Sequence, residues 1–592
     1  MKYGQCVPSS RMLITVLSIF FTLFHIVWSK DITEKRRIEL RDKAKEMFYH
    51  GFNNYMTHGF PLDELNPLNC SGRGRDKKDP NNIHVNDVLG EYTLTLIDSL
   101  DTLALLGDQK GFEEAVNLVI QTVDFDLDSK VQLFEVNIRV LGGLLSAHQL
   151  AIDEKLGYKI QGYKGELLDM AYDLGIRLLP AFGHSRTRIP YPRVNLRYGL
   201  PKGETSETCT AGAGSLMLEF GVLSKLTNDS RFDEVARTAI HGLWNRRSKS
   251  NLIGNVIDVE SGKWIHPIAS TGAGVDSFYE YMLKSYVLFG DAEFIQIYQQ
   301  AYKAIMEQVV DKSGYFYLNV NMYSGELAAT WIDSLSAYFA GVQVLAGDLE
   351  NAIKSHLVFY NLWRKYHAIP ERFDLNSKKP VVVHYPLRPE FVESTYLLYQ
   401  ATKDPFYLTV GEMVLNDLEK YTRVECGFAS VKSVITMTLE DRMESFVLSE
   451  TLKYLYLLFD TDHQINSLDS NFVFTTEGHP LFLSSEHVSP PRSSLKNFDS
   501  SLYTCPNLPK LPLISSTYFR PDTEFVRSII GHIPKEWPTL DEMGWCLDPR
   551  LTKDKIDISR QRSEIKARQP TKGIIDLDEP RIGKLWKWVF SR

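Results

Sequence analysis

The chain has few cysteines, and none of them lies in a recognisable metal-binding pattern. Six cysteines occur in 592 residues, without a Cys-x-x-Cys pair and without a cysteine–histidine spacing typical of zinc. Basic residues (66) are outnumbered by acidic residues (74), and no basic stripe stands out. The sequence therefore gives no basis for a structural zinc site or for a nucleic-acid partner.

Long apolar runs are also scarce. One such run extends from Met12 to Trp28, after Lys2 and Arg11 and before the charged stretch 30–41. This pattern predicts either a signal sequence, cleaved after Ser29, or an uncleaved membrane anchor. Because no second run of that length occurs, we expect the bulk of the chain to lie in an oxidising lumen.

Two glycosylation sequons, at Asn69 and Asn228, agree with a lumenal location. The sequence ends without the C-terminal tetrapeptide that retains proteins in the ER, so it does not indicate how the protein would be kept in that compartment. Beyond the signal the cysteines are Cys70, Cys209, Cys426, Cys505 and Cys546. An odd number in an oxidising compartment indicates one unpaired thiol or an intermolecular disulfide.

Helical periodicity dominates from about residue 32 to residue 459, with turns rich in glycine, proline and aspartate. Strand-like alternation is scarce and local, as at 315–320. The pattern predicts an all-α domain over 30–485 and an extended, largely irregular tail over 486–592 that packs in part on the domain. The clearest predicted helices are 92–106, 131–152, 214–226, 276–289, 391–402 and 444–459.

A short motif recurs in these helices, in which an apolar residue precedes an acid and a serine. The acids are Asp98, Asp276, Asp333, Glu393 and Glu444. A period near 60 residues suits a helical hairpin with its loops, and such hairpins close naturally into a toroid whose inner helices point residues at one centre. Each match covers only three loose positions, so coincidence is the alternative.

Carboxylates interrupt several apolar helix faces. Glu450 shares a face with Phe446 and Tyr454, and Glu219 and Glu135 lie among apolar neighbours on two other helices. A buried carboxylate costs several kcal/mol unless it is paired, hydrogen-bonded or metal-bound. One such acid is typical of a structural salt bridge, whereas several on separate helices indicate a shared polar cavity.

Two further acids follow Arg388 and a proline that suits the first turn of a helix. Glu390 and Glu393 are spaced i and i+3, so they share one face near the positive helix N-terminus. Ordinary charge complementarity explains such acids when they are exposed, but it explains the adjacent arginine less well. Asp276 also starts a helix, and capping is its alternative role.

Six segments resemble glycoside hydrolase family 47, the class I α1,2-mannosidases. They occur in the family's order at 96–103, 134–143, 275–281, 387–394, 448–454 and 475–480. Residues 63–67 with the following Cys70, and residues 208–212, are most similar to the branch of ER degradation-enhancing α-mannosidase-like proteins.

The resemblance implies an (α/α)7 barrel, a calcium ion at its base and inverting hydrolysis of terminal α1,2-linked mannose. In an inverting reaction the acid and the base stand roughly 6.5–9.5 Å apart to admit a water molecule. Glu135 matches the acid, Glu390 the base, and Asp276 a third essential acid. Neighbouring Arg139 would lower the pKa of Glu135, so protonation relayed through a bound water is one solution.

The resemblance also implies the ligands. Thr476 matches the residue that binds calcium directly, which fits a hard, oxygen-seeking cation. Acids that match positions around the ion, mostly through water, are Glu219, Glu393, Glu450 and Glu477. Arg139, Arg388 and Phe446 match substrate-binding positions, although plain core packing is an alternative for Phe446.

The chain departs from the family at two positions. Gly274 stands where some members carry a larger residue that helps to select the mannose branch, and Ala337 falls where processing mannosidases place a cysteine. The branch pattern instead implies a disulfide between Cys70 and Cys426. Either tail cysteine, Cys505 or Cys546, is then expected to form a mixed disulfide with an ER thiol oxidoreductase of the protein disulfide isomerase class.

Three functions remain open at this point. The first is trimming of glycans on misfolded glycoproteins in the ER lumen, which marks them for degradation. The second is a lectin-like receptor that binds mannose without chemistry, and the third is an adaptor whose tail recruits partners. Intact Glu135, Asp276 and Glu390 favour the enzyme.

Overall fold

The structure is a computed structural model that describes residues 32–183, 185–468, 470–484, 487–488 and 522–531. The predicted signal or anchor, both tail cysteines and most of the tail lie outside these residues. No helix within the described ranges is long and apolar enough to cross a membrane.

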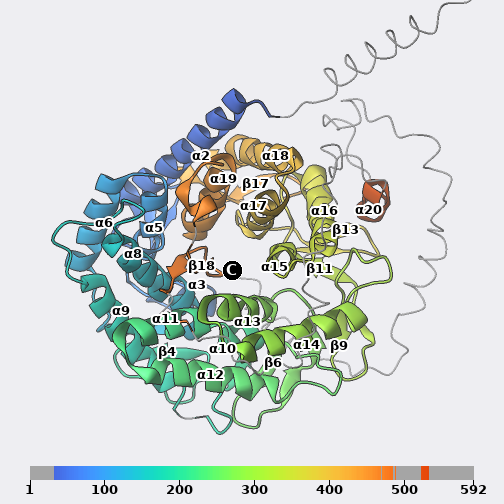
Figure 1. Ribbon diagram of the computed structural model, residues 1–592, viewed down its shortest axis with the longest axis horizontal. Coiled ribbons are helices and arrows are strands. Elements are labelled where there is room, and N and C mark those ends of the chain that lie inside the picture. Colours follow the sequence, from blue (N-terminus) through green and yellow to red (C-terminus); the bar gives the residue numbers. More distant parts are fainter. Residues whose placement is uncertain (1–31, 184, 469, 485–486, 489–521, 532–592) are drawn as a thin grey trace, which may run out of the picture.

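The helices form two concentric rings (Figure 1). The inner ring consists of α5 (Leu100–Leu105), α8 (Gly142–Ile152), α11 (Met217–Thr227), α13 (Asp276–Phe289), α15 (Phe339–Leu345), α17 (Glu390–Thr402) and α19 (Leu452–Phe459). The outer ring consists of α2 (Glu34–Asn54), α6 (Gln109–Thr122), α9 (Glu166–Leu178), α12 (Ser230–Trp244), α14 (Ala292–Gln308), α16 (Leu349–Tyr366) and α18 (Pro405–Thr422). Six inner helices pack on the outer helix that follows, and α19 closes the ring on α2. The predicted (α/α)7 barrel is confirmed.

Sequence patterns explain the two rings. The outer helix α6 buries Phe112, Ala115, Val116 and Val119, which lie on one face at helical spacing, and Asp108 caps its first turn. In the inner helix α13 most residues are buried, since both faces are covered by protein.

Short antiparallel strands connect the helices. Five sheets are two-stranded: β1 (Glu64–Asn66) with β2 (Ser71–Arg73), β3 (Lys130–Gln132) with β4 (Arg193–Asn195), β14 (Arg423–Val424) with β15 (Gly427–Phe428), β16 (Ser430–Ser433) with β17 (Thr438–Glu440), and β18 (Phe472–Phe474) with β19 (Pro480–Phe482). Three sheets are three-stranded, with the middle strand paired to both others: β5 (Glu207–Cys209), β6 (Val256–Asp258), β7 (Trp264–His266); β8 (Ile268–Ala269), β9 (Asn319–Asn321), β10 (Leu327–Ala329); and β11 (Trp331–Asp333), β12 (Arg372–Asp374), β13 (Lys379–Val382). Strands this short do not show a clear period of two, so the sequence revealed few of them.

Several predicted helices are interrupted. The first divides at Ser99 into α4 (Leu94–Asp98) and α5, and the second begins as strand β3. Two contain wide π-turns, η2 (Val136–Leu141) and η5 (Val447–Thr451). Further short helices are α3 (Ile83–Asn86), α7 (Leu133–Glu135), α10 (Thr210–Gly214), η1 (Tyr55–Gly59), η3 (Leu179–Ala181), η4 (Ser334–Tyr338) and η6 (Gln464–Ser467). Because π-turns are frequent at functional sites, η2 and η5 direct attention to Arg139 and Glu450.

One part of the predicted irregular tail is a helix, α20 (Asp522–Ile530), which packs on α16. Val526 and Ile530 are buried, and the Phe525 ring lies 5.5 Å from that of Tyr315. Lys365 donates from Nζ to the carbonyl oxygen of Ile530 at 2.7 Å. This segment packs on the domain, as predicted for part of the tail, but it is helical, because its apolar residues recur at helical spacing and meet a partner surface.

The disulfide implied by the resemblance is present. Cys70 and Cys426 are bonded, with their Cα atoms 5.4 Å apart and a sequence separation of 356. The bond ties β2 to the connection between α18 and β15. Asn69 and Asn228, the sequon asparagines, are exposed, and Asn69 donates from Nδ2 to Asp441 at 2.5 Å.

Replacing both Cys70 and Cys426 with serine is expected to lower the free energy of unfolding by about 2–5 kcal/mol, because a long loop in the unfolded chain is released. Denaturant titration measures the change, and the Asn69 sequon is kept in this variant. Reduced wild type provides the control, since it should unfold like the variant. An unchanged free energy of unfolding in the variant would contradict this expectation.

Candidate active site

The hairpin of β18 and β19 lies near the centre of the barrel (Figure 1). Its register pairs Phe474 with Pro480, so residues 475–479 form the connecting loop. Gly478 takes a φ of +71°, a left-handed conformation that suits glycine. Thr476 and Glu477, two predicted site residues, thus lie on a turn at the axis of the barrel.

A cavity opens beside this loop and encloses about 450 Å³, counting the part that is open to solvent. Its walls come mainly from inner helices, the π-turns and the loop 475–479, which is called the central loop below. The lining residues are Arg139, Asp276, Ser277, Glu280, Leu335, Tyr338, Arg388, Pro389, Glu390, Glu393, Phe446, Glu450, Thr476 and Glu477. Of the predicted catalytic, substrate and metal residues, all but Glu135 and Glu219 line it.

Glu135 and Glu219 lie behind the cavity wall. Glu135 is buried, and its Oε2 accepts a hydrogen bond from Arg139 Nε at 3.0 Å, so it reaches the cavity through Arg139. Glu219 accepts from the Tyr281 hydroxyl at 2.6 Å and from Asn137 Nδ2 at 2.8 Å. Burial outweighs these hydrogen bonds and raises the pKa of Glu219 to about 7.

Both cavity arginines lie close to the ring of Phe446. The guanidinium carbons of Arg139 and Arg388 are 5.5 Å and 6.0 Å from the centre of its ring. Arg388 binds Glu371 in a bidentate manner, at 2.5 Å and 2.9 Å, and its Nη1 lies 3.8 Å from Glu390 Oε1. These contacts hold an aromatic ring and two cationic groups at the cavity, an arrangement that suits a sugar.

Negative charge accumulates in this buried space. Six carboxyl groups line the cavity against two guanidinium groups. Burial, followed by the charges of Glu477 and Glu390, raises the pKa of Glu450 well above its usual range. Burial also raises the pKa of Glu393 to about 8, although the ammonium group of Lys284 opposes this shift. The cavity is therefore short of positive charge.

Sequence reasoning missed Glu280, Ser277, Leu335, Tyr338 and Pro389 as lining residues. Glu280 lies one helical turn after Asp276, a spacing that could have revealed it. It pairs with Lys284, whose Nζ also lies 3.6 Å from Glu393. Tyr338 donates from its hydroxyl to the Asp276 carbonyl oxygen at 2.8 Å.

The five acids of the recurring motif are all buried, as expected of an inner ring, but they make different contacts. Asp276 and Glu393 line the cavity. Asp333 accepts from the Ala273 backbone N–H at 3.3 Å, and Glu444 pairs with Arg442. Asp98 lies beneath the central loop.

A ring of helical hairpins around an acid-lined, arginine- and aromatic-containing cavity defines a carbohydrate-processing barrel. The model of glycosyl hydrolase family 47 matches residues 47–483, and the chain belongs to this family. It is thus a glycoside hydrolase by family.

Curated relatives extend over most of the chain. The ER degradation-enhancing alpha-mannosidase-like protein 1 of Schizosaccharomyces pombe is 46% identical over 88% of this chain and 67% of its own length. The alpha-mannosidase I MNS5 of Arabidopsis thaliana is 46% identical over 83% of this chain and 85% of its own. The human ER degradation-enhancing alpha-mannosidase-like protein 3 is 44% identical over 84% of this chain, but only 55% of its own length is covered.

A solved structure agrees with the barrel. The alpha-1,2-mannosidase from Trichoderma reesei is 25% identical, with a TM-score of 0.66, and the match covers 75% of this chain and 99% of that one. The barrel of this chain therefore has the architecture of that enzyme.

Proposed function

We propose that this chain removes terminal α1,2-linked mannose from high-mannose N-glycans of misfolded glycoproteins in the ER lumen, and so marks them for degradation. The observation that carries the proposal is the single cavity in which Asp276 and Glu390 lie beside Arg139, Arg388 and Phe446. The printed names of the relatives, ER degradation-enhancing and α-mannosidase, support the substrate and the compartment.

The reaction proceeds by inversion at the anomeric carbon. Glu390, which is only 15% exposed and held near Arg388, acts as the base that takes a proton from the attacking water. Glu135 supplies the proton to the leaving oxygen. Because Glu135 is hydrogen-bonded to Arg139 behind the wall, a water molecule carries that proton across. Asp276 orients the reacting groups from the start of α13.

Calcium suits the donors of this cavity. The acids Glu393, Glu450 and Glu477 line the same cavity as Thr476, and the excess of carboxylates favours a hard divalent cation. No group of three or more histidine, cysteine or acid side chains in the described ranges is arranged to hold a metal ion. Thr476 would be the direct ligand, and the acids would hold the ion mostly through water. The ion supplies charge that binds and orients sugar hydroxyls. Glu219 does not line the cavity and acts on the site through its hydrogen bond with the Tyr281 hydroxyl.

The test is mannose release from a high-mannose glycoprotein, native and unfolded, by full-length protein purified with any disulfide-linked partner. We expect release that calcium chelation and Glu135→Gln both abolish. Glycan binding without release would move the assignment to a lectin-like receptor. Release that persists in the Glu135→Gln variant would show that Glu135 is not the general acid, while the hydrolase activity itself would stand.

The mixed disulfide of Cys505 or Cys546 with an ER oxidoreductase stays part of the proposal. Both cysteines lie outside the described residues, and their test is biochemical. Cys505→Ser and Cys546→Ser variants are compared on non-reducing gels, where a partner adduct is expected to disappear in one of them. Only intramolecular bonds in the wild type would contradict the idea.

A further inference from the structure

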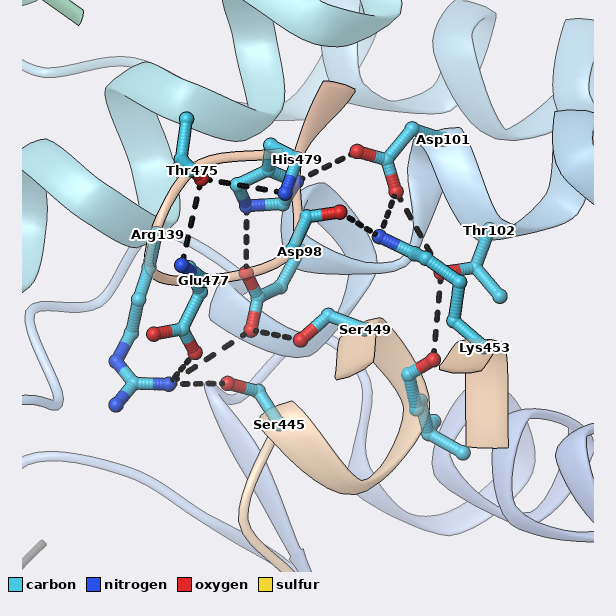
Figure 2. Close-up of polar contacts among 12 residues, drawn as sticks. Asp98, Asp101, Thr102, Arg139, Ser445, Ser449, Lys453, Thr475, Glu477 and His479 are labelled. Atoms are coloured by element: carbon cyan, nitrogen blue, oxygen red, sulfur yellow. Dashed lines mark hydrogen bonds and ion pairs between the residues drawn. The ribbon is translucent and has the colours of Figure 1, made fainter. Parts of the chain in front are cut away.

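A buried ion-pair network lies beneath the central loop, and the roles described so far do not use it (Figure 2). His479, at the end of the loop, has its Nδ1 2.6 Å from Asp101 Oδ2 and its Nε2 3.1 Å from Asp98 Oδ1. All three side chains are fully buried. The imidazole ring is therefore held at two points by acids that belong to α4 and α5.

Lys453 of α19 joins the same network. Its Nζ lies 2.7 Å from Asp101 Oδ1 and donates to the carbonyl oxygen of Gly478 at 2.7 Å. Gly478 is the residue at which the loop turns, with positive φ. Lys453 thus contacts the backbone of the turn directly and links it to α19 and to Asp101.

The loop is closed from within by Thr475. Its Oγ1 accepts from the backbone N–H of Glu477 at 3.3 Å and from that of His479 at 3.2 Å, and its own N–H donates to the His479 carbonyl oxygen at 2.9 Å. Thr476 and Glu477 therefore project from a turn that is anchored on both sides, and their backbone has little freedom.

The network continues into the cavity. Asp98 Oδ2 lies 3.9 Å from Arg139 Nη1, and the same guanidinium nitrogen pairs with Glu477. Three acids (Asp98, Asp101 and Glu477) pair with three basic groups (Arg139, Lys453 and His479), and all six side chains are buried (Figure 2). Because an unpaired buried charge is costly, a shift of the loop away from these partners would be opposed by the loss of several ion pairs.

We propose that Lys453 and His479 are positioning residues that fix the 475–479 loop and thereby set the affinity of the cavity for its divalent cation. The inference rests on the cation site of the proposed function. It adds the two residues that hold the loop carrying Thr476 and Glu477 in place. Neither side chain lines the cavity, so each acts through the loop and not by touching the ion or the sugar.

The experiment uses the full chain carrying Lys453→Met, which keeps the apolar stem and removes the contact with Gly478. The matched control is Lys365→Met, because Lys365 also donates to a backbone carbonyl at 2.7 Å, on α20 and away from the cavity. Calcium chloride is titrated into protein stripped with chelator, and the rise in Tm gives the calcium midpoint for each protein. We expect Lys453→Met to raise that midpoint by about 10–100-fold, as is usual for residues that orient metal ligands.

The control is expected to keep the wild-type midpoint. Should Lys453→Met fail to fold, Thr475→Val carries the same expectation, since it loosens the loop without changing the buried charge. Equal midpoints in wild type and Lys453→Met would overturn the inference and leave the proposed function intact. A wild type without any calcium response would overturn the cation site and the inference with it.

Discussion

Glu390→Gln is expected to lower kcat for mannose release by about 10²–10⁴-fold, the usual contribution of a general base. The amide keeps the shape of the side chain but cannot take the proton of the attacking water. Binding of high-mannose glycan should persist, because Arg139, Phe446 and most of the cavity are unchanged. Mannose release and glycan binding are measured on the same preparation.

Glu307→Gln is the matched control for this variant. Glu307 lies on the outer helix α14, where its contact with Lys303 is a surface ion pair at 3.9 Å, and the substitution should leave kcat unchanged. If Glu390→Gln retains wild-type kcat, the base is another residue of the cavity.

Arg139→Met is expected to lower the free energy of unfolding by about 3–5 kcal/mol, the cost of breaking a buried ion pair by removing one partner. Arg139 is 3% exposed and contacts Glu135, Glu477 and Asp98, so its loss leaves buried carboxylates without their counter-charge. Denaturant titration measures this effect. Mannose release should also disappear, because Glu135 loses its contact at the cavity.

Arg177→Met supplies the comparison. Arg177 pairs with Asp173 at 2.8 Å near the surface of α9, and such pairs contribute about 0–1 kcal/mol. An Arg139→Met variant that unfolds at the same denaturant concentration as Arg177→Met would show that the buried acids do not depend on this arginine.

Much of the barrel follows from local pattern. The bounds of α13 were predicted as 276–289 and those of α17 to within one residue, because both helices have continuous apolar spacing. Gly290, in the left-handed region with a φ of +74°, ends α13 and gives the pattern a clear stop. Where spacing is regular and a terminator is present, sequence alone locates a helix.

The π-turns could not be predicted in this way. Residues 136–141 and 447–451 carry the same periodicity as the helices around them, and the extra residue in each turn leaves no trace in that pattern. The wider turns accompany long-range contacts, such as that of Arg139 with Glu477. These contacts join parts of the chain 338 residues apart, so no window of sequence contains them.

The candidate site was predictable where an acid interrupts an apolar face. Glu450 was recognised on that basis. Glu393 was recognised by the face it shares with Glu390 at the start of a helix, and the family resemblance supplied Thr476 and the roles of the arginines. Glu280 was missed because most residues of α13 are buried, so the helix has no polar face against which a single acid would stand out. The network of His479 and Lys453 was missed because its partners come from three separate segments.

The most direct test of the account is the anomer of mannose that the wild-type protein releases. Proton NMR during the first minutes of the reaction distinguishes α-mannose from β-mannose before mutarotation mixes them. The account predicts β-mannose, since a water activated by Glu390 attacks the face opposite the leaving group. Initial release of α-mannose would contradict the inverting mechanism, and no release from native or unfolded glycoprotein would contradict the hydrolase itself.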